Sequence, residues 1–294
     1  MDSNIIDSTF LVTGAGGVIG MPLMKRLSDN KINYLSISRK RSDERTIRCD
    51  LESALSAEII TRLKNIDAVI HTAPLWLLPK HIPDLGKQGI KRIIAFSSSS
   101  IVGKSKTTDS NESQLVKALS QAEKELDELC GKYKIELTVF RPTMIYGYGR
   151  DQNVTHLAKI IRRYRLMILV GQAQGLRQPV HADDLVDACF AVLNNPKSYG
   201  KTYNLAGAEA LTYYDMVVAI FEALNIKPRI VSSPLWLFRC ILKLATLTGK
   251  FSYTADMADR MNQDLNYEYS DAEADFGFSP QRFLTQPSRD LVIE

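Results

Sequence analysis

Three glycines near the start of the chain have the spacing of a phosphate-binding turn. Gly14, Gly17 and Gly20 follow the apolar run 10–12 and precede a helical pattern that begins at Met21. A diphosphate needs backbone N–H groups aimed at it above a helix N-terminus, and residues without a Cβ let the backbone approach that closely. A strand, such a turn and a helix in this order predict a dinucleotide-binding site rather than a plain surface turn. The predicted contacts are Gly14, Gly17, Val18, Ile19 and Gly20.

Basic residues follow the second predicted strand, 34–38, which ends in Arg39, Lys40 and Arg41. An acidic residue at this place would bind the hydroxyls of the adenosine ribose, whereas a basic one binds a 2′-phosphate. Arg39 and Lys40 therefore favour NADP(H) over NAD(H). The alternative is a solvated basic turn that contacts no ligand.

Further apolar segments predict a parallel sheet. Strands are expected at 46–51, 67–73, 91–96 and 136–140, and a helix at 111–131 has leucines at alternating spacings of four and three. Strands that alternate with helices predict an α/β fold, a Rossmann-type doubly wound parallel sheet, whose ligands bind at the carboxyl ends of the strands.

The later half of the chain has shorter strands and helices with good N-terminal caps. Capping boxes are expected at Thr212 with Asp215 and at Ser270 with Glu273. We expect a dinucleotide-binding domain over residues 1–145, to which 178–206 return. Residues 146–177 and 207–294 are expected to form a smaller, interleaved C-terminal substrate-binding region.

The composition excludes several classes of protein. With 294 residues, 45% hydrophobic and 24% charged, the chain is of ordinary globular type, and a net charge of +4 is too mild to imply a nucleic-acid partner. Its four cysteines form no Cys-x-x-Cys pair, so neither zinc nor a disulfide framework is expected, and no other metal is predicted. The first residues lack the order of a signal peptide, so a cytoplasmic location is expected.

One apolar segment raises the question of a membrane. Residues Leu235 to Ala245 are apolar except for Arg239 and Lys243, which is the spacing of an amphipathic helix. Such a helix either lies on a membrane or packs in its own chain, and we favour the second. Membrane contact is therefore not expected, and this segment is the only candidate for it.

The order of the motifs resembles the short-chain dehydrogenase/reductase superfamily, in its extended branch of NAD-dependent epimerases and dehydratases. The matching motifs are Thr13 to Gly20, Asp50-Leu51, His71-Thr72-Ala73, Ser97 to Ser100, Arg141-Pro142, Tyr146-Gly147 and Arg177 to Asp184. The resemblance implies further cofactor contacts at Asp50, Leu51, Thr72, Ala73, Ser97 and Pro142. It implies substrate contacts at Tyr146, Asn153 and Arg177, although Arg177 in a structural ion pair is the alternative. We expect His71 and His181 to serve packing and hydrogen bonding rather than act as bases.

The chain departs from the chemistry of that superfamily. There, a Tyr-x-x-x-Lys pair and a Ser or Thr move a proton while hydride passes to or from nicotinamide, and the Lys cation lowers the pKa of the phenol. None of the 12 tyrosines here is followed by Lys four positions later. Counting back from Glu123 and Arg141 puts the pair at Leu115 and Leu119, both expected on the apolar stripe of their helix.

Other registers do not restore the pair. A shift by two residues gives Ser113 and Lys117, which supplies the cation but no phenol. Ser99 matches the catalytic hydroxyl of the superfamily best, and a simple loop hydroxyl is the alternative. The connection from Ala73 to Lys91 is too short for the long helix that commonly joins the superfamily's dimer interface, so a monomer or a differently built oligomer is expected.

Two functions remain open at this point. The first is an NAD(P)-binding epimerase, dehydratase or reductase for a nucleotide sugar or related small carbonyl compound, with a proton from Ser99, Tyr146 or water. The second is a non-catalytic NADP(H)-binding sensor or assembly subunit, which the two leucines favour.

Overall fold

The computed structural model describes residues 8–39, 42–103, 110–234, 236 and 260–292. The chain forms two compact units. The first comprises residues 1–142, 182–205 and 268–279, and the second comprises 143–181, 206–267 and 280–294. Among the described residues, no helix combines the length and apolar character needed to cross a membrane.

A seven-stranded parallel sheet forms the centre of the first unit. Its strands are β1 (Thr9–Thr13), β2 (Asn33–Ser38), β3 (Thr46–Arg48), β4 (Ala68–His71), β5 (Arg92–Phe96), β6 (Glu136–Pro142) and β11 (Lys201–Leu205). They lie in the order β11-β6-β5-β4-β1-β2-β3, and every neighbouring pair is parallel. Successive strands are added on one side of β1 up to β3 and on the other side from β4 onward, and the point between β1 and β4 where the order reverses is where sheets of this kind bind ligands. The predicted α/β class is confirmed.

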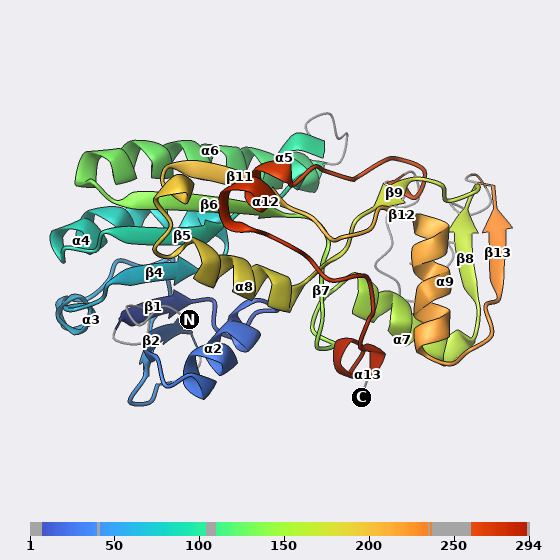
Figure 1. Cartoon of the computed structure of the whole chain (residues 1–294), viewed down its shortest axis with the longest axis horizontal. Helices are drawn as coiled ribbons and strands as arrows, with labels where there is room; N and C mark the ends of the chain where they lie inside the picture. Colours follow the sequence, from blue (N-terminus) through green and yellow to red (C-terminus); the bar gives the residue numbers. More distant parts are fainter. Residues whose placement is uncertain (1–7, 40–41, 104–109, 235, 237–259, 293–294) are drawn as a thin grey trace. The chain divides into compact units, whose positions relative to one another are not determined.

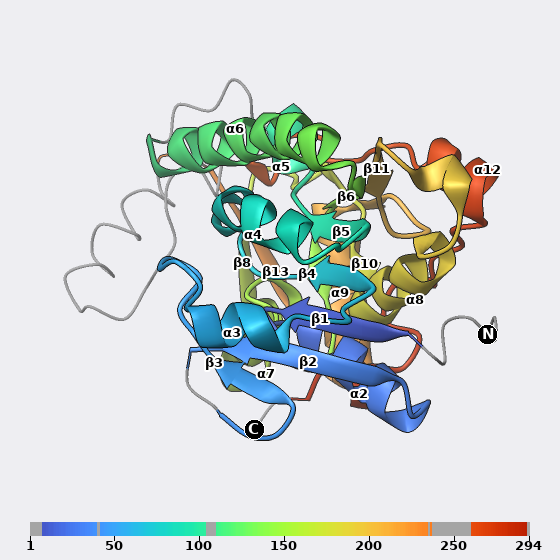
Figure 2. The same cartoon turned by 90° about the vertical axis from the view of Figure 1, so that its left-hand side faces the viewer.

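Helices cover both faces of this sheet (Figures 1 and 2). One face carries α2 (Gly20–Asp29), α8 (Ala182–Val192) and α12 (Ser270–Phe276), and the other carries α3 (Ala57–Arg62), α4 (Ile82–Lys87) and α6 (Ser110–Tyr133). Strand residues such as Val69 and Ile93 form one buried cluster with Leu119 and Leu126 of α6. Burial on both faces explains why the strands are continuous apolar runs.

The connection between β4 and β5 is short. It consists of the 3₁₀ turns η1 (Leu75–Leu77) and η2 (Pro79–His81) and the six-residue α4. The expected absence of a long helix here is confirmed. The oligomeric state remains a prediction.

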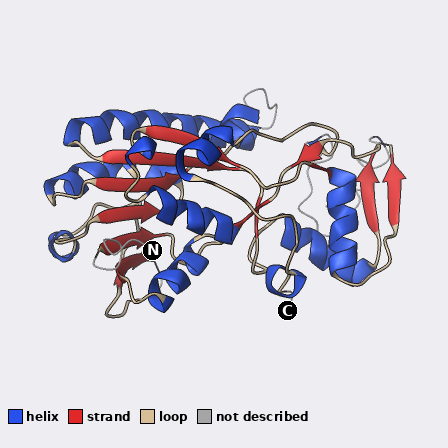
Figure 3. Cartoon of the chain, viewed as in Figure 1, coloured by secondary structure: helices blue, strands red, loops and turns tan. Residues whose placement is uncertain are grey.

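The second unit has little sheet (Figure 3). Its strands pair in twos, β7 (Ile145–Tyr146) with β10 (Val180–His181), β8 (Met167–Val170) with β13 (Ile230–Ser233), and β9 (Leu176–Arg177) with β12 (Leu211–Thr212). Helices α7 (Val154–Tyr164) and α9 (Tyr213–Ala223) bury Leu157, Ile161 and Phe221 in one apolar cluster, and α13 (Pro287–Asp290) lies near the C-terminus.

One of the two predicted helix caps is present in the structure and the other is not. The Thr212 hydroxyl accepts the N–H of Asp215 at 2.9 Å and caps α9, as expected. The expected cap at Ser270 is wrong, because α12 already includes Ser270 and begins after Tyr269, with no side-chain cap. Gly277, with a φ of +71°, ends that helix in the left-handed region that glycine favours.

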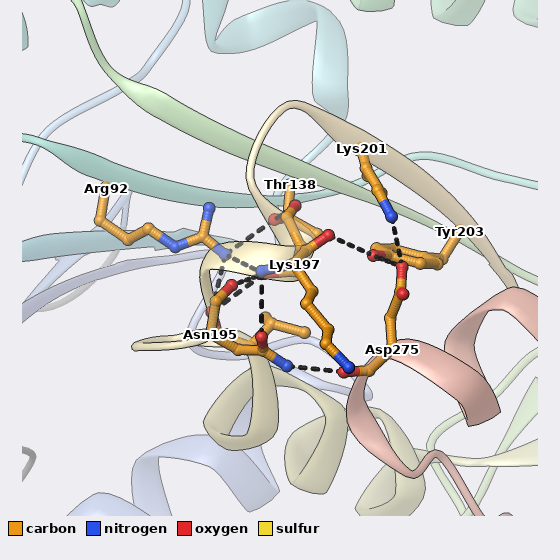
Figure 4. A network of polar contacts seen from close by, with 9 residues as sticks. Arg92, Thr138, Asn195, Lys197, Lys201, Tyr203 and Asp275 are labelled. Atoms are coloured by element: carbon orange, nitrogen blue, oxygen red, sulfur yellow. Dashed lines mark hydrogen bonds and ion pairs between the residues drawn. The ribbon is translucent and has the colours of Figure 1, made fainter.

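A buried arginine joins several elements of the first unit (Figure 4). Arg92 opens β5, is 6% exposed, and donates to the carbonyl oxygens of Val192 (2.9 Å) and Leu193 (3.2 Å) at the end of α8. It also donates to the hydroxyls of Thr138 at 2.7 Å and Ser198 at 3.2 Å. These acceptors are neutral, and the carbonyl end of a helix offers a partial negative charge to a cation. Burial lowers the pKa of Arg92 to about 10.

The same network fastens α12 to β11 (Figure 4). The Asp275 carboxylate accepts from Lys201 Nζ and from the Tyr203 hydroxyl, both at 2.6 Å. The Asn195 amide donates to the Asp275 carbonyl oxygen at 2.8 Å. Residues 268–279 are thereby tied to the edge strand of the sheet.

We predict that Arg92→Met lowers the free energy of unfolding by about 2–4 kcal/mol, because several buried acceptors lose their donor. Lys91→Met is the control, since Lys91 is the exposed neighbour, and it should change stability by less than about 0.5 kcal/mol. Urea denaturation of both variants measures the difference. Equal stability of Arg92→Met and the unmodified chain would contradict the role given to the network.

Candidate functional site

The glycine turn brings β1, α2 and the end of β4 together without side chains between them. A Cβ on Gly20 would lie 2.2 Å from the carbonyl oxygen of Gly14. A Cβ on Gly14 would lie 2.5 Å from the nitrogen of Ala73, and the φ of Gly14 is +74°. Real Cβ contacts are never this short, so both positions require glycine. This placement explains the spacing that predicted the site.

The other side of the turn is open. Within the described part of the chain, a Cβ on Gly16 would meet nothing within 4 Å, and one on Gly17 would meet only the Gly14 oxygen, at 3.2 Å. Helix α2 starts here after Ile19 with no side-chain cap and no acidic residue in its first turn. An uncapped helix N-terminus with free space beside it suits a diphosphate, which accepts N–H bonds and is attracted by the helix dipole.

A buried histidine aligns the ends of β1 and β4. His71 Nδ1 lies 2.8 Å from the Thr13 hydroxyl, and Nε2 lies 3.1 Å from the carbonyl oxygen of Pro74. A carbonyl only accepts, so Nε2 carries the hydrogen and Nδ1 accepts from Thr13. Burial lowers the pKa of His71 to about 4, which keeps the ring neutral. This geometry agrees with the expectation that His71 holds structure and is not a base.

Two further predicted cofactor contacts adjoin this pair. The Thr72 hydroxyl donates to the carbonyl oxygen of Thr13 at 2.7 Å, and Ala73 is the residue that Gly14 approaches. Thr13 and Gly16 belong to the same turn but were not among the predicted cofactor contacts. The Thr-Gly sequence could have pointed to Thr13. The spacing of Gly14, Gly17 and Gly20 could not have pointed to Gly16, because it gives that residue no role.

The ends of β2 and β3 lie side by side. Arg39 is exposed directly after β2, and Lys40 lies outside the described residues. Asp50 is exposed after β3, with Oδ1 accepting the N–H of Glu52 at 3.0 Å. Leu51 is 8% exposed, and its carbonyl oxygen lies 3.0 Å from His81 Nε2. Arg39 and Asp50 are thus available at this end of the sheet.

A serine at the end of β5 has an orphaned hydroxyl. Ser97 Oγ is buried and has no hydrogen-bond partner among the residues that the structure describes, while its N–H donates to the Phe140 oxygen at 2.7 Å. Buried hydroxyls are almost always bonded, so an orphaned one at the carboxyl end of a parallel strand fits a polar group of a ligand. Ser99 is 7% exposed, and its N–H donates to the carbonyl oxygen of Pro142 at 3.1 Å. Ser97, Ser99 and Pro142 therefore lie on the neighbouring strand ends β5 and β6.

The expected positions of the catalytic Tyr and Lys are counted from Glu123 and Arg141, and these two residues form an ion pair in the structure. Arg141 Nε donates to Glu123 at 2.9 Å, and Nη2 bonds the second carboxylate oxygen. Leu119 is 4% exposed and belongs to the core of the first unit, as expected. The expectation for Leu115 is wrong, because its side chain is 39% exposed instead of lying on the buried stripe. Neither leucine can exchange a proton.

Two of the predicted substrate contacts lie at different depths in the second unit. Tyr146 is fully buried, and its hydroxyl accepts the N–H of Leu284 at 3.1 Å and donates to the Arg282 oxygen at 3.4 Å. In this conformation the Tyr146 hydroxyl is bonded to backbone, and its role as a substrate contact or proton donor stays a prediction. Asn153 is exposed at the start of α7, where Asp151 supplies the capping carboxylate at 2.9 Å from the Asn153 N–H.

The third, Arg177, is held by backbone oxygens. It is 4% exposed, and Nη1 donates to the carbonyl oxygens of Leu176 at 2.7 Å and Gln263 at 2.8 Å. Nη2 donates to the Arg260 oxygen, and the guanidinium carbon lies 5.4 Å from the centre of the Tyr213 ring. In this conformation two guanidinium nitrogens serve the chain itself. A role as substrate anchor stays a prediction.

Comparison with known proteins settles the family. Residues 10–77 and 84–206 match the model of the NAD dependent epimerase/dehydratase family. The chain belongs to this family.

Individual relatives are distant. UDP-glucose 4-epimerase of Vibrio cholerae is 25% identical over 311 residues, covering 95% of this chain and 92% of the relative. The solved UDP-glucuronic acid 4-epimerase of Bacillus cereus, in complex with UDP-glucuronic acid and NAD, has a TM-score of 0.73 at 17% identity, covering 96% and 98% of the two chains. The mitochondrial NADH dehydrogenase [ubiquinone] 1 alpha subcomplex subunit 9 of Dictyostelium discoideum is 28% identical over 134 residues, or 44% of this chain and 36% of that protein.

The glycine turn leads to a stability prediction. Gly20→Ala should destabilise the chain by about 1–3 kcal/mol, because the added Cβ displaces the Gly14 backbone. Gly16→Ala is the matched control and should change stability by less than about 0.5 kcal/mol, since its Cβ meets open space. Thermal unfolding of the two variants tests this, and equal melting temperatures would show that the turn relaxes freely.

His71 leads to a pH prediction. Burial lowers the pKa of His71 from its ordinary value of 6.5 to about 4. Between these values the unfolded chain binds a proton that the folded chain does not, so stability is complete above pH 6.5 and is lost as the pH falls. We expect a loss of about 2 kcal/mol between pH 7 and about pH 4.5. The free energy of unfolding, measured by urea denaturation at several pH values, should depend less on pH in His71→Gln. It should keep its pH dependence in the exposed control His156→Gln. Identical profiles for all three proteins would contradict the assignment.

Proposed function

We propose that this protein binds NADP(H) in its first unit and acts on a nucleotide-linked sugar or a related small carbonyl compound as an epimerase, dehydratase or reductase. The observation that carries the proposal is the glycine turn. Gly14 and Gly20 admit no side chain, Gly16 borders open space, and α2 presents an uncapped N-terminus. A dinucleotide supplies the diphosphate that fits this arrangement and, through nicotinamide, a hydride donor or acceptor.

The preference for NADP(H) is argued from charge. Arg39 is the first residue after β2 and is exposed, so the carboxylate that binds ribose hydroxyls in NAD-specific proteins is replaced by a cation there. The next described acid, Asp43, accepts the N–H of Arg45 at 2.9 Å and is engaged in its own turn. Arg45 in turn lies 5.4 Å from the centre of the Tyr34 ring on β2. A 2′-phosphate would therefore meet cations.

The substrate class is proposed from relatives. The Vibrio cholerae relative is a UDP-glucose 4-epimerase, and the Bacillus cereus structure contains UDP-glucuronic acid. UDP-glucose and UDP-glucuronic acid are nucleoside diphosphate sugars. Arginine is the side chain that can bind a diphosphate through two parallel hydrogen bonds. We propose that residues 146–177 and 207–294 bind the substrate, with Arg177 and Asn153 as contacts.

The chemistry of this protein would lack the usual phenol. Leu115 and Leu119 stand at the expected Tyr and Lys positions, and Tyr146 is buried with its hydroxyl bonded to backbone. Ser99 or water would then move the proton. Loss of a positioned general acid costs about 10²- to 10⁴-fold in rate, so slow catalysis is expected.

The second proposal is a non-catalytic NADP(H)-binding subunit or sensor. It is favoured by the exposed Leu115 and the core residue Leu119, since neither exchanges protons. The partial match to a subunit of NADH dehydrogenase supports it as well. For either proposal a cytoplasmic, reducing location agrees with the free thiols of Cys49, Cys130 and Cys189.

Calorimetry separates these proposals. NADPH, NADH, UDP-glucose and UDP-glucuronic acid are titrated in turn into the full chain. The enzyme should bind NADPH more tightly than NADH and bind a nucleotide sugar, with slow hydride transfer seen at the nicotinamide absorbance band. A sensor should bind NADPH and neither sugar. Failure of both dinucleotides to bind would overturn both proposals.

A charge at the turn tests where the dinucleotide binds. Gly16→Asp places a carboxylate in the open space beside the N-terminus of α2, where it should repel the diphosphate and weaken NADPH binding about tenfold or more. Gly16→Ala is the steric control, because it adds a Cβ at the same place without a charge. Equal NADPH affinity for Gly16→Asp and Gly16→Ala would place the dinucleotide elsewhere.

A further inference from the structure

One part of the second unit is strongly basic. Helix α7 carries Lys159, Arg162 and Arg163, Arg165 directly follows this helix, and the segment before β13 carries Lys227 and Arg229. All six side chains are exposed. Neither 152–170 nor 223–233 contains an Asp or Glu. Like charges so placed repel one another, so their gathering does not serve the stability of the fold.

The two basic segments lie side by side. β13 pairs with β8 in parallel, with Ile230 opposite Met167, and the Met167 N–H donates to the carbonyl oxygen of Arg229 at 2.9 Å. Arg165 ends α7 two residues before Met167. The cations from α7 and from the start of β13 therefore form one patch. Within the described part of the chain, Arg163, Arg165, Lys227 and Arg229 make no ion pair.

Large apolar side chains are exposed among these cations. Tyr164 is 52% exposed, Leu166 38% and Val231 50%. The Arg163 guanidinium carbon lies 5.3 Å from the centre of the Tyr164 ring. Trp236, three residues beyond β13, is 67% exposed. Exposed aromatic and aliphatic residues between cations are the composition of surfaces that lie in the headgroup region of a bilayer.

We propose that this patch, formed by Arg163, Tyr164, Arg165, Leu166, Arg229 and Val231, docks the protein on an anionic lipid membrane. The cations attract the negative surface, and the apolar side chains enter the interface. A nucleic acid would use the cations and the tyrosine ring but would gain nothing from Leu166 and Val231, which is why a membrane is the better partner. Docking of this kind is peripheral and needs no membrane-spanning helix.

Chain order adds to the argument. No Asp or Glu occurs between Ala223 and Ala255, a stretch that contains five lysines and arginines. The segment Leu235 to Ala245, where membrane contact was considered and not favoured, belongs to this stretch. Apart from Trp236 it lies outside the described residues, and the proposed surface does not include it.

Vesicle sedimentation of the full chain tests the proposal. The protein should bind vesicles of phosphatidylcholine with phosphatidylglycerol, should not bind phosphatidylcholine alone, and should be released by salt. No dinucleotide or sugar is required, so the result is independent of the proposed enzymatic function. Binding to a single-stranded RNA oligonucleotide without binding to anionic vesicles would overturn the proposal.

A charge-matched pair of variants locates the surface. Arg163→Glu with Arg229→Glu should lower the partition coefficient about 25-fold or more, at about fivefold per cation removed. The control, Lys64→Glu with Lys124→Glu, changes exposed cations of the first unit. Each substitution changes the charge by two, so both variants go from +4 to 0. The control should retain most of its binding.

Equal losses of vesicle binding in the two variants would show that the membrane attracts the net charge of the protein and not this patch, and would overturn the proposal. If the glutamate variant does not fold, Arg163→Gln with Arg229→Gln takes its place against Lys64→Gln with Lys124→Gln. A third variant, Tyr164→Ser with Val231→Ser, leaves the charge unchanged and should also weaken binding. Unchanged binding by this apolar variant would show that insertion is absent and would overturn the membrane as partner.

Discussion

The approach of one backbone to another at Gly14 and Gly20 is the constraint on which the first unit depends. With no Cβ at either position, the end of β1, the start of α2 and the residue after β4 share a space that side chains fill elsewhere. The hydrogen bonds of Thr13 with His71 and Thr72 then hold the ends of β1 and β4 level. The N-terminus of α2, next to this contact, has no side-chain cap. Tight backbone packing and a candidate ligand site thus lie within the same few residues.

Local features of the sequence predicted much of this unit. A glycine spacing, strand-length apolar runs and the distance from Ala73 to Lys91 each act over a few residues, so their structural meaning can be read directly. Glu123 and Arg141, from which the catalytic register is counted, form an ion pair in the structure that the sequence had not indicated. The exposure of Leu115 did not follow, because helix periodicity gives the buried face only where another element covers it.

Contacts between distant parts of the chain could not be predicted. Arg92 at the start of a strand looks like a surface cation, yet it is buried because the end of α8 and the Thr138 and Ser198 hydroxyls supply acceptors. Residues 268–279 return to the first unit through Asp275, which no local pattern indicates. Tyr146 is buried for a similar reason, since Leu284 and Arg282 are more than a hundred residues away.

Arg177 has a consequence for binding affinity. Its guanidinium is already occupied by oxygens of the chain, including those of Arg260 and Gln263. A ligand that needs this cation competes with an intramolecular partner at high effective concentration. The apparent dissociation constant then equals the intrinsic one divided by the fraction of molecules in which Arg177 is released. Release of Arg177 would then select between ligands. A diphosphate offers enough acceptors to replace the hydrogen bonds that Arg177 makes to the backbone, whereas a ligand with one weak acceptor does not.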